Sequence, residues 1–399
     1  MVDPFDLSDL SYLAPISLSA SQDHDSERST YGELVNEIYK CGSRILRYRE
    51  DYLETRSSAP PEESPQHEFV SKGDFLCAGR DFTVFAGHLF KDYNASPSFP
   101  QKNRGKRGYG DHKFVKPSSG TTASSASRMS TSAKPTHVAV ALKESVQSIH
   151  KDNNRPVVLG TFLKEIRIMG EMKSCTHIVD LLGVAFVEVG PEVKPTLVVS
   201  LALGNLVDFF HSKAIPTITW QLKSHFALHI VSALQALHEM HTVHADVKAQ
   251  NVLVFPDEST QFCAKLSDFG NSIPAGAGYP IAAGTKYYLA PECFNSEGDD
   301  AGYLGTGNLE HRDVYAFGLV VWEIATSCLR LPFSDVNLDD EVVRMKCNGE
   351  AARHLLAHIP ENTPQYVRKA IIDTLHVDPT GRPPLSAVSE QLRKGSEEA

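Results

Sequence analysis

Apolar residues in the early part of the chain form short runs typical of strands, whereas after about residue 219 they recur at helical spacing. The runs 75–87, FLCAGRDFTVFAG, and 137–143, HVAVALK, predict two short strands around a turn and then a third strand. A helical pattern follows, and then two strand-like runs at 178–188 and 196–201. The order of these elements predicts an α+β fold with a small sheet-rich part and a larger helical part.

The residues before the first of these strands differ in character from the rest. Residues 1–30 are polar and lack apolar periodicity, and 57–65 is rich in proline, which is typical of a linker. Apolar residues at near-helical spacing predict one helix within 31–52. We therefore expect an acidic N-terminal extension, residues 1–70, partly disordered with one helix, followed by a folded domain over 71–395.

A long polar block separates the second and third predicted strands. Residues 94–135 are rich in Ser, Thr, Gly, Pro and basic residues and poor in large apolar ones. Loop-closure entropy grows slowly with length, so a domain can tolerate such a segment. We predict a disordered, basic insertion.

Composition limits the class of protein. Hydrophobic residues make up 41% and charged residues 22% of the 399 residues, which is typical of a soluble globular protein. No run of 18 apolar residues occurs, and three aspartates in the first ten residues do not fit a signal peptide. Seven scattered cysteines without a C-x-x-C pair indicate reduced thiols. We expect an intracellular protein, cytoplasmic or nuclear, without a membrane span or a nucleic-acid partner.

Charge is segregated between the two polar segments. Residues 1–70 carry 14 acidic and 6 basic residues, a net charge of −8, and residues 88–136 carry 9 basic and 2 acidic residues, a net charge of +7. The acidic extension could therefore contact the basic insertion or bind a regulatory partner.

Three motifs in the second half carry most of the functional signal. They are HADVKAQN at 244–251, SDFG at 267–270 and GTKYYLAPE at 284–292. A lone aspartate in a loop is usually a turn former. In this order and at this spacing, however, the motifs resemble the catalytic loop, metal-binding loop and activation-segment end of the eukaryotic protein kinases.

This resemblance implies a bilobal fold, with ATP bound in the cleft between the lobes, and a role for each matching residue. Asp246 would accept the proton of the attacking hydroxyl, and Lys248 would place a positive charge beside the transferred phosphate. Asn251 and Asp268 would hold Mg²⁺, which prefers hard oxygen ligands.

The resemblance also extends to the predicted sheet. Val140 to Lys143 is similar to the V-A-I-K strand of the family, and it implies that Ala141 lines the nucleotide site and that Lys143 binds phosphates. Glu165 is the expected partner of Lys143, with Glu171 as the alternative. In the glycine-rich loop G-x-G-x-x-G-x-V, only one glycine remains. Cys77, Gly79, Phe82 and Val84 stand at the four specified positions.

Two further segments resemble parts of the helical lobe. HRDVYAFGLVVWE at 311–323 contains Asp313, which is expected to anchor the catalytic loop. DPTGRPP at 378–384 contains Arg382, which is expected to pair with Glu292.

The details favour a serine/threonine kinase, because Lys248 and Thr285 match that branch of the family. The reduced glycine loop and the short tail resemble lineage-specific kinases of filamentous fungi. Two alternatives remain: a pseudokinase scaffold with weak or no nucleotide turnover, and an enzyme of the same fold that acts on a small-molecule alcohol. The A-P-E segment and Thr285, which build a peptide-docking surface in the family, argue against the second.

One departure predicts how the protein is regulated. The arginine of H-R-D, which commonly pairs with a phosphorylated activation-loop residue, is replaced by Ala245. Between Gly270 and Gly284, Ser272 and Tyr279 supply the only hydroxyls. We therefore expect activity that does not depend on phosphorylation of this loop.

Overall fold

The computed structural model describes residues 38, 43–49, 69–79, 82–90, 137–146, 155–189, 192–213, 218–275, 279–280, 284–294, 303–304, 309–337 and 339–398. The chain divides into two compact units. The first contains the described residues up to 170 together with 181–200, and the second contains 171–180 and the described residues from 201 onward. Each unit is described below by itself.

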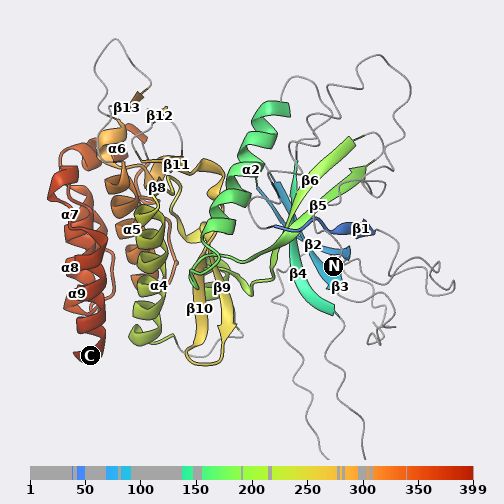
Figure 1. Cartoon of the computed structure of the whole chain (residues 1–399). Coiled ribbons are helices and arrows are strands. Elements are labelled where there is room, and N and C mark those ends of the chain that lie inside the picture. Colours follow the sequence, from blue (N-terminus) through green and yellow to red (C-terminus); the bar gives the residue numbers. More distant parts are fainter. Residues whose placement is uncertain are drawn as a thin grey trace, which may run out of the picture. The chain divides into compact units, whose positions relative to one another are not determined.

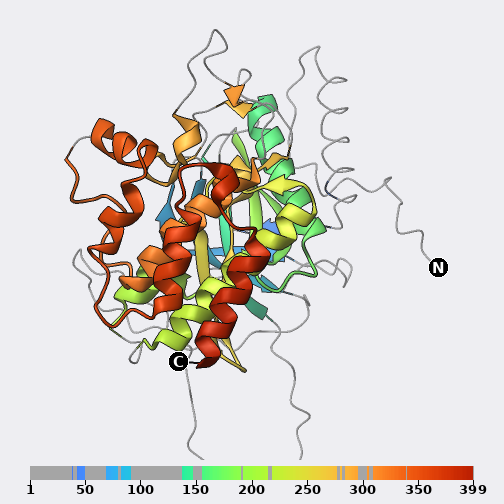
Figure 2. The ribbon, with the colours of Figure 1, turned by 90° about the vertical axis from the view of Figure 1, so that its left-hand side faces the viewer.

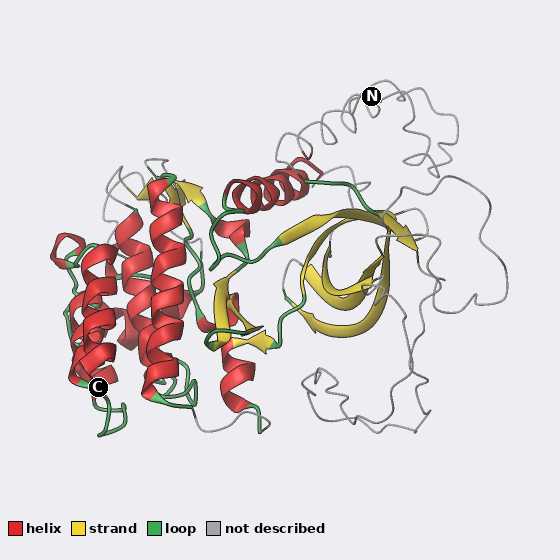
Figure 3. Ribbon diagram, turned by 60° about the horizontal axis from the view of Figure 1, so that its bottom comes forward, coloured by secondary structure: helices red, strands yellow, loops and turns green. Residues whose placement is uncertain are grey.

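The first unit is a six-stranded sheet with the strand order β1-β2-β3-β4-β6-β5 (Figures 1 and 3). Its strands are β1 (Arg47–Arg49), β2 (Phe69–Ala78), β3 (Phe82–Phe90), β4 (His137–Ser145), β5 (Leu181–Val189) and β6 (Glu192–Ser200). The β1–β2 pair is parallel, and the other pairs are antiparallel. Helix α2 (Arg155–Glu171) follows β4 along the chain. Alternating apolar residues place Val140, Leu142 and Val198 in one buried cluster.

The short segment before β2 closes this sheet. Leu46 donates its N–H to the carbonyl of Val184 in β5 (2.7 Å), and Val184 donates its own to Arg44 (2.9 Å), while β1 pairs with β2. Gly183 permits the contact, because a Cβ there would lie 2.7 Å from Leu46 Cδ1. The chain near residue 46 therefore joins the two edges of the sheet and covers part of each edge strand.

This arrangement corrects part of the sequence interpretation. The helix predicted within 31–52 does not extend to its end, because 47–49 form a strand. Residues 44–49 belong to the sheet rather than to a separate extension. The predicted strands and the helix after residue 158 are present, with β2 beginning earlier than expected, at Phe69. The insertion at 94–135 lies outside the described residues.

The second unit is mostly helical. Its helices are α3 (Leu206–His211), α4 (Trp220–Glu239), α5 (Glu310–Ala325), α6 (Asp339–Cys347), α7 (Ala351–Leu356), α8 (Gln365–Thr374) and α9 (Leu385–Glu398). Helix α4 begins at Thr219, whose hydroxyl accepts the N–H of Leu222 (3.2 Å). Helix α9, red in Figures 1 and 2, packs along α4, and α5 packs against α4 and α8. Side chains from Arg312 to Ala325 of α5 are buried, so α5 forms the centre of this unit.

Short strands in the second unit support its loops. They are β7 (Gly204–Asn205), β8 (Thr242–Val243), β9 (Val252–Asp257), β10 (Gln261–Leu266), β11 (Ile273–Pro274), β12 (Tyr279–Pro280) and β13 (Tyr303–Leu304). Strand β8 pairs with β11, and β9 pairs with β10 and β7. The loop between β8 and β9 thus has a strand at each end. Among the described residues, no helix is both long enough and apolar enough to cross a membrane. The α+β fold predicted from the sequence, with a sheet-rich and a helical part, is confirmed.

Candidate active site

The loop from His244 to Asn251 joins β8 to β9, and α5 holds its first residues. The buried carboxylate of Asp313 accepts the backbone N–H groups of His244 (2.8 Å) and Ala245 (2.9 Å) and lies 2.9 Å from Nε2 of His238. Burial alone would raise the pKa of Asp313, but the hydrogen bond from His238 and the backbone N–H groups lower it below its ordinary value. Asp313 therefore stays a carboxylate and fixes the backbone of the loop.

The backbone of Ala245 needs this support. Its φ is 63°, in the left-handed region, which costs a residue with a Cβ about 1–2 kcal/mol. The hydrogen bond from Ala245 to Asp313 compensates for this strain by holding the peptide in place. The strained turn brings the next residue, Asp246, to face the segment that starts at Gly284.

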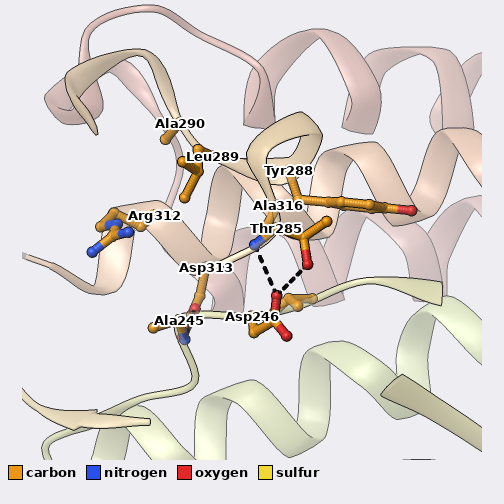
Figure 4. Close-up of a pocket in the computed structure, with 10 residues that line it drawn as sticks. Ala245, Asp246, Thr285, Tyr288, Leu289, Ala290, Arg312, Asp313 and Ala316 are labelled. Carbon is orange, nitrogen blue, oxygen red and sulfur yellow. Dashed lines mark hydrogen bonds between the residues drawn. The ribbon is translucent and has the colours of Figure 1, made fainter. Parts of the chain in front are cut away.

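The carboxylate of Asp246 lies at the centre of a small polar group. Its Oδ2 accepts from Nζ of Lys248 (2.6 Å), and its Oδ1 accepts from the backbone N–H (3.1 Å) and the hydroxyl (2.8 Å) of Thr285. Lys248 also donates to the hydroxyl of Thr285 (2.9 Å). Figure 4 shows Thr285 pointing toward Asp246. The side chain of Asp246 is thus held in one orientation by charged and polar donors.

A pocket opens beside this carboxylate. It is lined by residues 245–247 of the loop, by parts of 285–290, and by Arg312, Asp313 and Ala316 of α5 (Figure 4). Tyr288, at its wall, donates its hydroxyl to the buried carboxyl of Glu323 (2.8 Å), whose pKa is raised by burial to about 8. This bond ties the segment around Thr285 to α5.

Asn251 and Asp268 lie on two segments that are bonded to each other. The backbone N–H and the hydroxyl of Ser267 both donate to the carbonyl of Asn251 (2.9 Å each). The Nδ2 group of Asn251 donates to the carbonyl of Asp246 (2.8 Å), so the amide presents its oxygen, Oδ1, on the other side. Asp268 follows Ser267 directly and has a left-handed backbone, with φ 68°. Hard oxygen donors on neighbouring, fixed segments suit Mg²⁺.

Lys143 and Glu165, both in the first unit, form an ion pair. Nζ of Lys143 in β4 lies 2.7 Å from Oε2 of Glu165 in α2, and their side chains are 16% and 10% exposed. The structure thus brings Lys143 together with Glu165, the first of the two carboxylates considered from the sequence. This ion pair holds the ammonium group of Lys143 in one position within the sheet-rich unit.

The turn between β2 and β3 contains the departure from the glycine-rich pattern. Gly79 donates its N–H to the carbonyl of Phe82 (2.8 Å), and a Cβ at Gly79 would lie 2.8 Å from Cζ of the Phe82 ring. The same ring lies 4.5 Å from Nζ of Lys143. Cys77 is exposed, and Val84 lies opposite both Cys77 and Lys143 in the sheet register. Phe82 therefore takes space where the family pattern has a glycine, and a side chain at position 79 would require its ring to move.

Ala141 occupies the strand that carries Lys143. It lies opposite Ala86 of β3 and is buried. Together with Val84 it supplies small apolar surface near the ion pair.

Two buried cations hold the second half of the 284–292 segment, one at Glu292 and one at the backbone of Tyr287 and Leu289. Arg382, whose side chain is fully buried, makes two hydrogen bonds to the carboxylate of Glu292 (2.7 Å each), as the sequence predicted. Lys346 of α6, also fully buried, donates Nζ to the carbonyls of Tyr287 (2.6 Å) and Leu289 (2.7 Å).

Lys346 is an unusual buried cation. Its Nζ lies within 6 Å of the ring centroids of Phe294, Tyr315 and Phe333. Burial lowers the pKa of Lys346 to about 7. The two backbone carbonyls and the rings therefore replace water around the amine.

Sequence analysis did not identify Lys346, or Asn271, whose Nδ2 lies 3.4 Å from Oδ2 of Asp246. Asn271 follows D-F-G directly, so its position in the motif was a usable signal. A single lysine on an amphipathic helix gives no such signal, because exposure is its usual state.

Ala245 belongs to an apolar cluster. Val243, Ala245, Ile273 and Leu309 form a buried cluster, against which Ala275 packs. Ser272 is buried too, and its hydroxyl lies 3.3 Å from the carbonyl of His244. Apolar groups therefore occupy the place where the family arginine would begin.

The sheet-rich unit with its lysine–glutamate pair, and the helical unit with its D-x-K-x-x-N loop and D-F-G segment, define a protein of the protein kinase class. Residues 118–392 match the family described as Protein tyrosine and serine/threonine kinase. The chain belongs to this family.

Three relatives illustrate the similarity. A probable serine/threonine-protein kinase of Dictyostelium discoideum is 27% identical over 256 residues, which cover 63% of this chain and 14% of the relative. A probable LIM domain-containing serine/threonine-protein kinase of the same organism is 31% identical over 49% of this chain and 18% of the relative. An L-type lectin-domain containing receptor kinase of Arabidopsis thaliana is 35% identical over 33% of this chain and 19% of the relative. The chain thus spans less than a fifth of the length of each.

Proposed function

We propose that this protein is an ATP-dependent protein kinase that transfers the γ-phosphate of ATP to serine and threonine hydroxyls of protein substrates. The observation that carries the proposal is the arrangement around Asp246, where a carboxylate is held by Lys248 and Thr285 beside a pocket. A carboxylate fixed in this way can orient a hydroxyl and accept its proton.

In the proposed reaction the substrate hydroxyl oxygen forms a bond to the γ-phosphorus while the bond from this phosphorus to the bridging oxygen of ADP breaks. Asp246 accepts the proton that the hydroxyl loses. Lys248 keeps a positive charge next to Asp246, where it would face the transferred phosphoryl oxygens. Positioning and charge supply most of the rate enhancement in this class of reaction.

The metal proposed for this site is Mg²⁺, with Asn251 and Asp268 as its ligands. One amide oxygen and one carboxylate fit a cation that keeps several waters and binds substrate phosphates. When bound, Mg²⁺ would neutralise charge on the phosphates. The Ser267 hydrogen bonds to Asn251 support the assignment, because they hold the two ligand segments together before any cation arrives.

The residues proposed for nucleotide binding lie in the sheet-rich unit. Lys143 would bind the phosphates and Glu165 would orient it, as their ion pair suggests. The remaining candidates line the same face of the sheet or its turn: Cys77, Gly79, Val84 and Ala141.

Transfer to serine or threonine in a protein is supported by two residues. Lys248 and Thr285 bond to each other and to Asp246, and both match the serine/threonine branch of the family. A small-molecule alcohol as acceptor is less well supported, because Glu292 and Arg382 maintain the segment that receives peptides in protein kinases. The resemblance to kinases of filamentous fungi rests on the sequence alone and stays a prediction.

The rival function is a pseudokinase scaffold with weak or no turnover. The specific observation in its favour is the Phe82 ring, which packs against Gly79 and lies over Lys143. Fewer backbone N–H groups could then approach the phosphates. Against it, Lys143, Asp246, Lys248, Asn251 and Asp268 are all present.

Incubation of the purified protein with radiolabelled ATP, Mg²⁺ and a generic protein acceptor tests the proposed function. We expect label on serine or threonine with the wild-type chain and a loss of at least about a hundredfold with Asp246→Asn. If the wild-type chain transfers no phosphate under any condition yet still binds nucleotide, the scaffold function replaces the enzymatic one.

We also expect activity to be independent of activation-loop phosphorylation. The alanine side chain at position 245 cannot bind a phosphate, its cluster with Val243, Ile273 and Leu309 is apolar, and Ser272 is buried. Treating the active protein with phosphatase, or replacing Ser272 with alanine and Tyr279 with phenylalanine, should leave peptide phosphorylation within about twofold. Silencing of a folded protein by either change would contradict this expectation.

Three further proposals rest on the sequence alone. The segment 1–70 before the kinase domain binds a regulatory partner, the domain proper extends over 71–395 with its insertion at 94–135, and the protein works in the cytoplasm or nucleus. Residues 44–49, which fall within this first segment, also pair with the sheet.

A further inference from the structure

A group of three side chains far along the chain from the motifs converges on one point of the helical unit. Asp335 lies between α5 and α6, His354 lies in α7, and His358 follows α7. Nε2 of His354 lies 3.2 Å from Oδ2 of Asp335, and Nε2 of His358 lies 3.5 Å from the same oxygen. One ligand atom from each residue lies within 4.8 Å of the other two.

Two of these spacings, 3.2 and 3.5 Å, are close to the edges of a metal coordination sphere. Nitrogen and oxygen ligands lie about 2.0–2.2 Å from Zn²⁺ in a tetrahedron, so neighbouring ligand atoms are about 3.3–3.6 Å apart. The 3.5 Å separation between His358 and Asp335 is too long for a strong hydrogen bond but falls within this range.

The hydrogen bond of the His358 ring favours coordination through Nε2 of this residue. Nδ1 of His358 lies 3.0 Å from the carbonyl of His354, which can accept only if Nδ1 carries the proton. In the neutral ring, Nε2 of His358 then has its lone pair directed at Asp335. The ring of His354 stacks on that of buried Phe333, with 6.0 Å between centroids and 14° between planes.

Local position and exposure agree with this geometry. His354 lies within α7, which ends at Leu356, and His358 lies in the turn that follows, with its Nδ1 3.0 Å from the carbonyl of His354. The three side chains are 20–38% exposed, so an ion can reach them from solvent. Asp335 supplies the negative charge that offsets part of the charge of the cation.

A second histidine-containing group is less suitable. His177, His229 and Cys263 also lie close together, but Nδ1 of His229 accepts the backbone N–H of Ala264 (3.2 Å). In the neutral ring, the proton of His229 must then be on Nε2. Nδ1 of His229 could bind a metal only if it lost the hydrogen bond from Ala264. His358 has the opposite arrangement, with its backbone bond made by donation.

We propose that Asp335, His354 and His358 form a zinc site, with a water molecule as the fourth ligand. A Zn²⁺ ion there links the segment after α5 to α7 and to the turn that follows it. The site lies apart in sequence from the residues assigned to phosphoryl transfer. The short helix α7, six residues long, gains a fixed connection that its own hydrogen bonds cannot supply.

Zinc binding to the full-length chain, stripped with a chelator and free of nucleotide, tests the proposal. Titration of Zn²⁺ against a chromophoric competitor should show one ion per chain. Asp335→Asn and His358→Gln should each weaken the affinity about 100-fold or more, since losing even an outer-shell partner costs 10–100-fold. Both side chains are partly exposed, and circular dichroism checks that the variants fold.

A second readout and a matched control separate this site from the other group. Zinc at about 100 times the wild-type dissociation constant should raise the thermal midpoint of the wild-type chain by about 5 °C and that of the variants by about 1 °C or less. Cys263→Ser should bind zinc as the wild-type chain does. Equal affinity in Asp335→Asn, no stoichiometric binding, or loss of binding in Cys263→Ser would each overturn the proposal.

Discussion

Replacing Asp268 with asparagine should lower the rate of Mg²⁺-dependent phosphoryl transfer about a hundredfold or more while leaving the fold intact. The substitution keeps the size of the side chain and removes the charge that would hold the cation against the phosphates. A loss of about 3 kcal/mol of transition-state stabilisation corresponds to this factor. The left-handed backbone of residue 268 tolerates asparagine well, so the change acts on charge rather than on conformation.

Initial rates with a peptide acceptor at several Mg²⁺ concentrations provide the measurement. The matched control is Asp340→Asn, which removes an exposed carboxylate from α6 and should keep the wild-type rate. A folded Asp268→Asn protein with near wild-type turnover would remove this residue from the mechanism.

Replacing Arg382 with alanine should give the largest loss of stability of any single change considered for this chain, about 3–5 kcal/mol. The guanidinium of Arg382 makes two bonds to Glu292 and also donates to the carbonyls of His311 and His376. It lies 5.0 Å from the ring centroid of Tyr315. Alanine would leave a cavity, several backbone carbonyls without their donor, and a carboxylate without its counter-charge.

Denaturant unfolding of the wild-type and variant proteins measures this difference. Arg393→Ala is the matched control, because Arg393 pairs with Glu390 and Glu397 on the exposed face of α9 and should contribute little. Arg382→Lys should recover only part of the loss, since an ammonium group cannot make the two parallel bonds to Glu292. If Arg382→Ala unfolds at the wild-type denaturant concentration, the buried pair does not stabilise the helical unit.

Much of the fold and the candidate site could be predicted because the relevant residues stand in short contiguous motifs. Asp246, Lys248 and Asn251 lie within six residues, and the loop that carries them is recognisable without any knowledge of distant contacts. The pairing of Lys143 with Glu165 was implied by the resemblance of 140–143 to the V-A-I-K strand of the family.

Features that depend on distant partners could not be predicted in this way. Ile45 and Leu46 are adjacent apolar residues, which fit a helix or a strand equally well, and the deciding contact is with Val184, far away in sequence. Phe82 was recognised from the sequence only as a missing glycine, because the contact of its ring with Gly79 depends on the shape of the turn.

The zinc ligands illustrate the same limit. Asp335 lies in a segment without regular structure, 19 residues before His354, and nothing in the local pattern connects them. Only the packing of α7 against its neighbours brings the three side chains together.

The buried amine of Lys346 also limits which residues position 346 can accept. Any replacement must either donate to the carbonyls of Tyr287 and Leu289 or admit water between α6 and the segment that those residues form. Methionine would fill the space but could not donate, and arginine would exceed it. The solvent-facing positions of α6 other than Asp339, which binds Lys286 and Tyr287, could therefore be redesigned, whereas lysine has to be kept at position 346 together with the backbone that it holds.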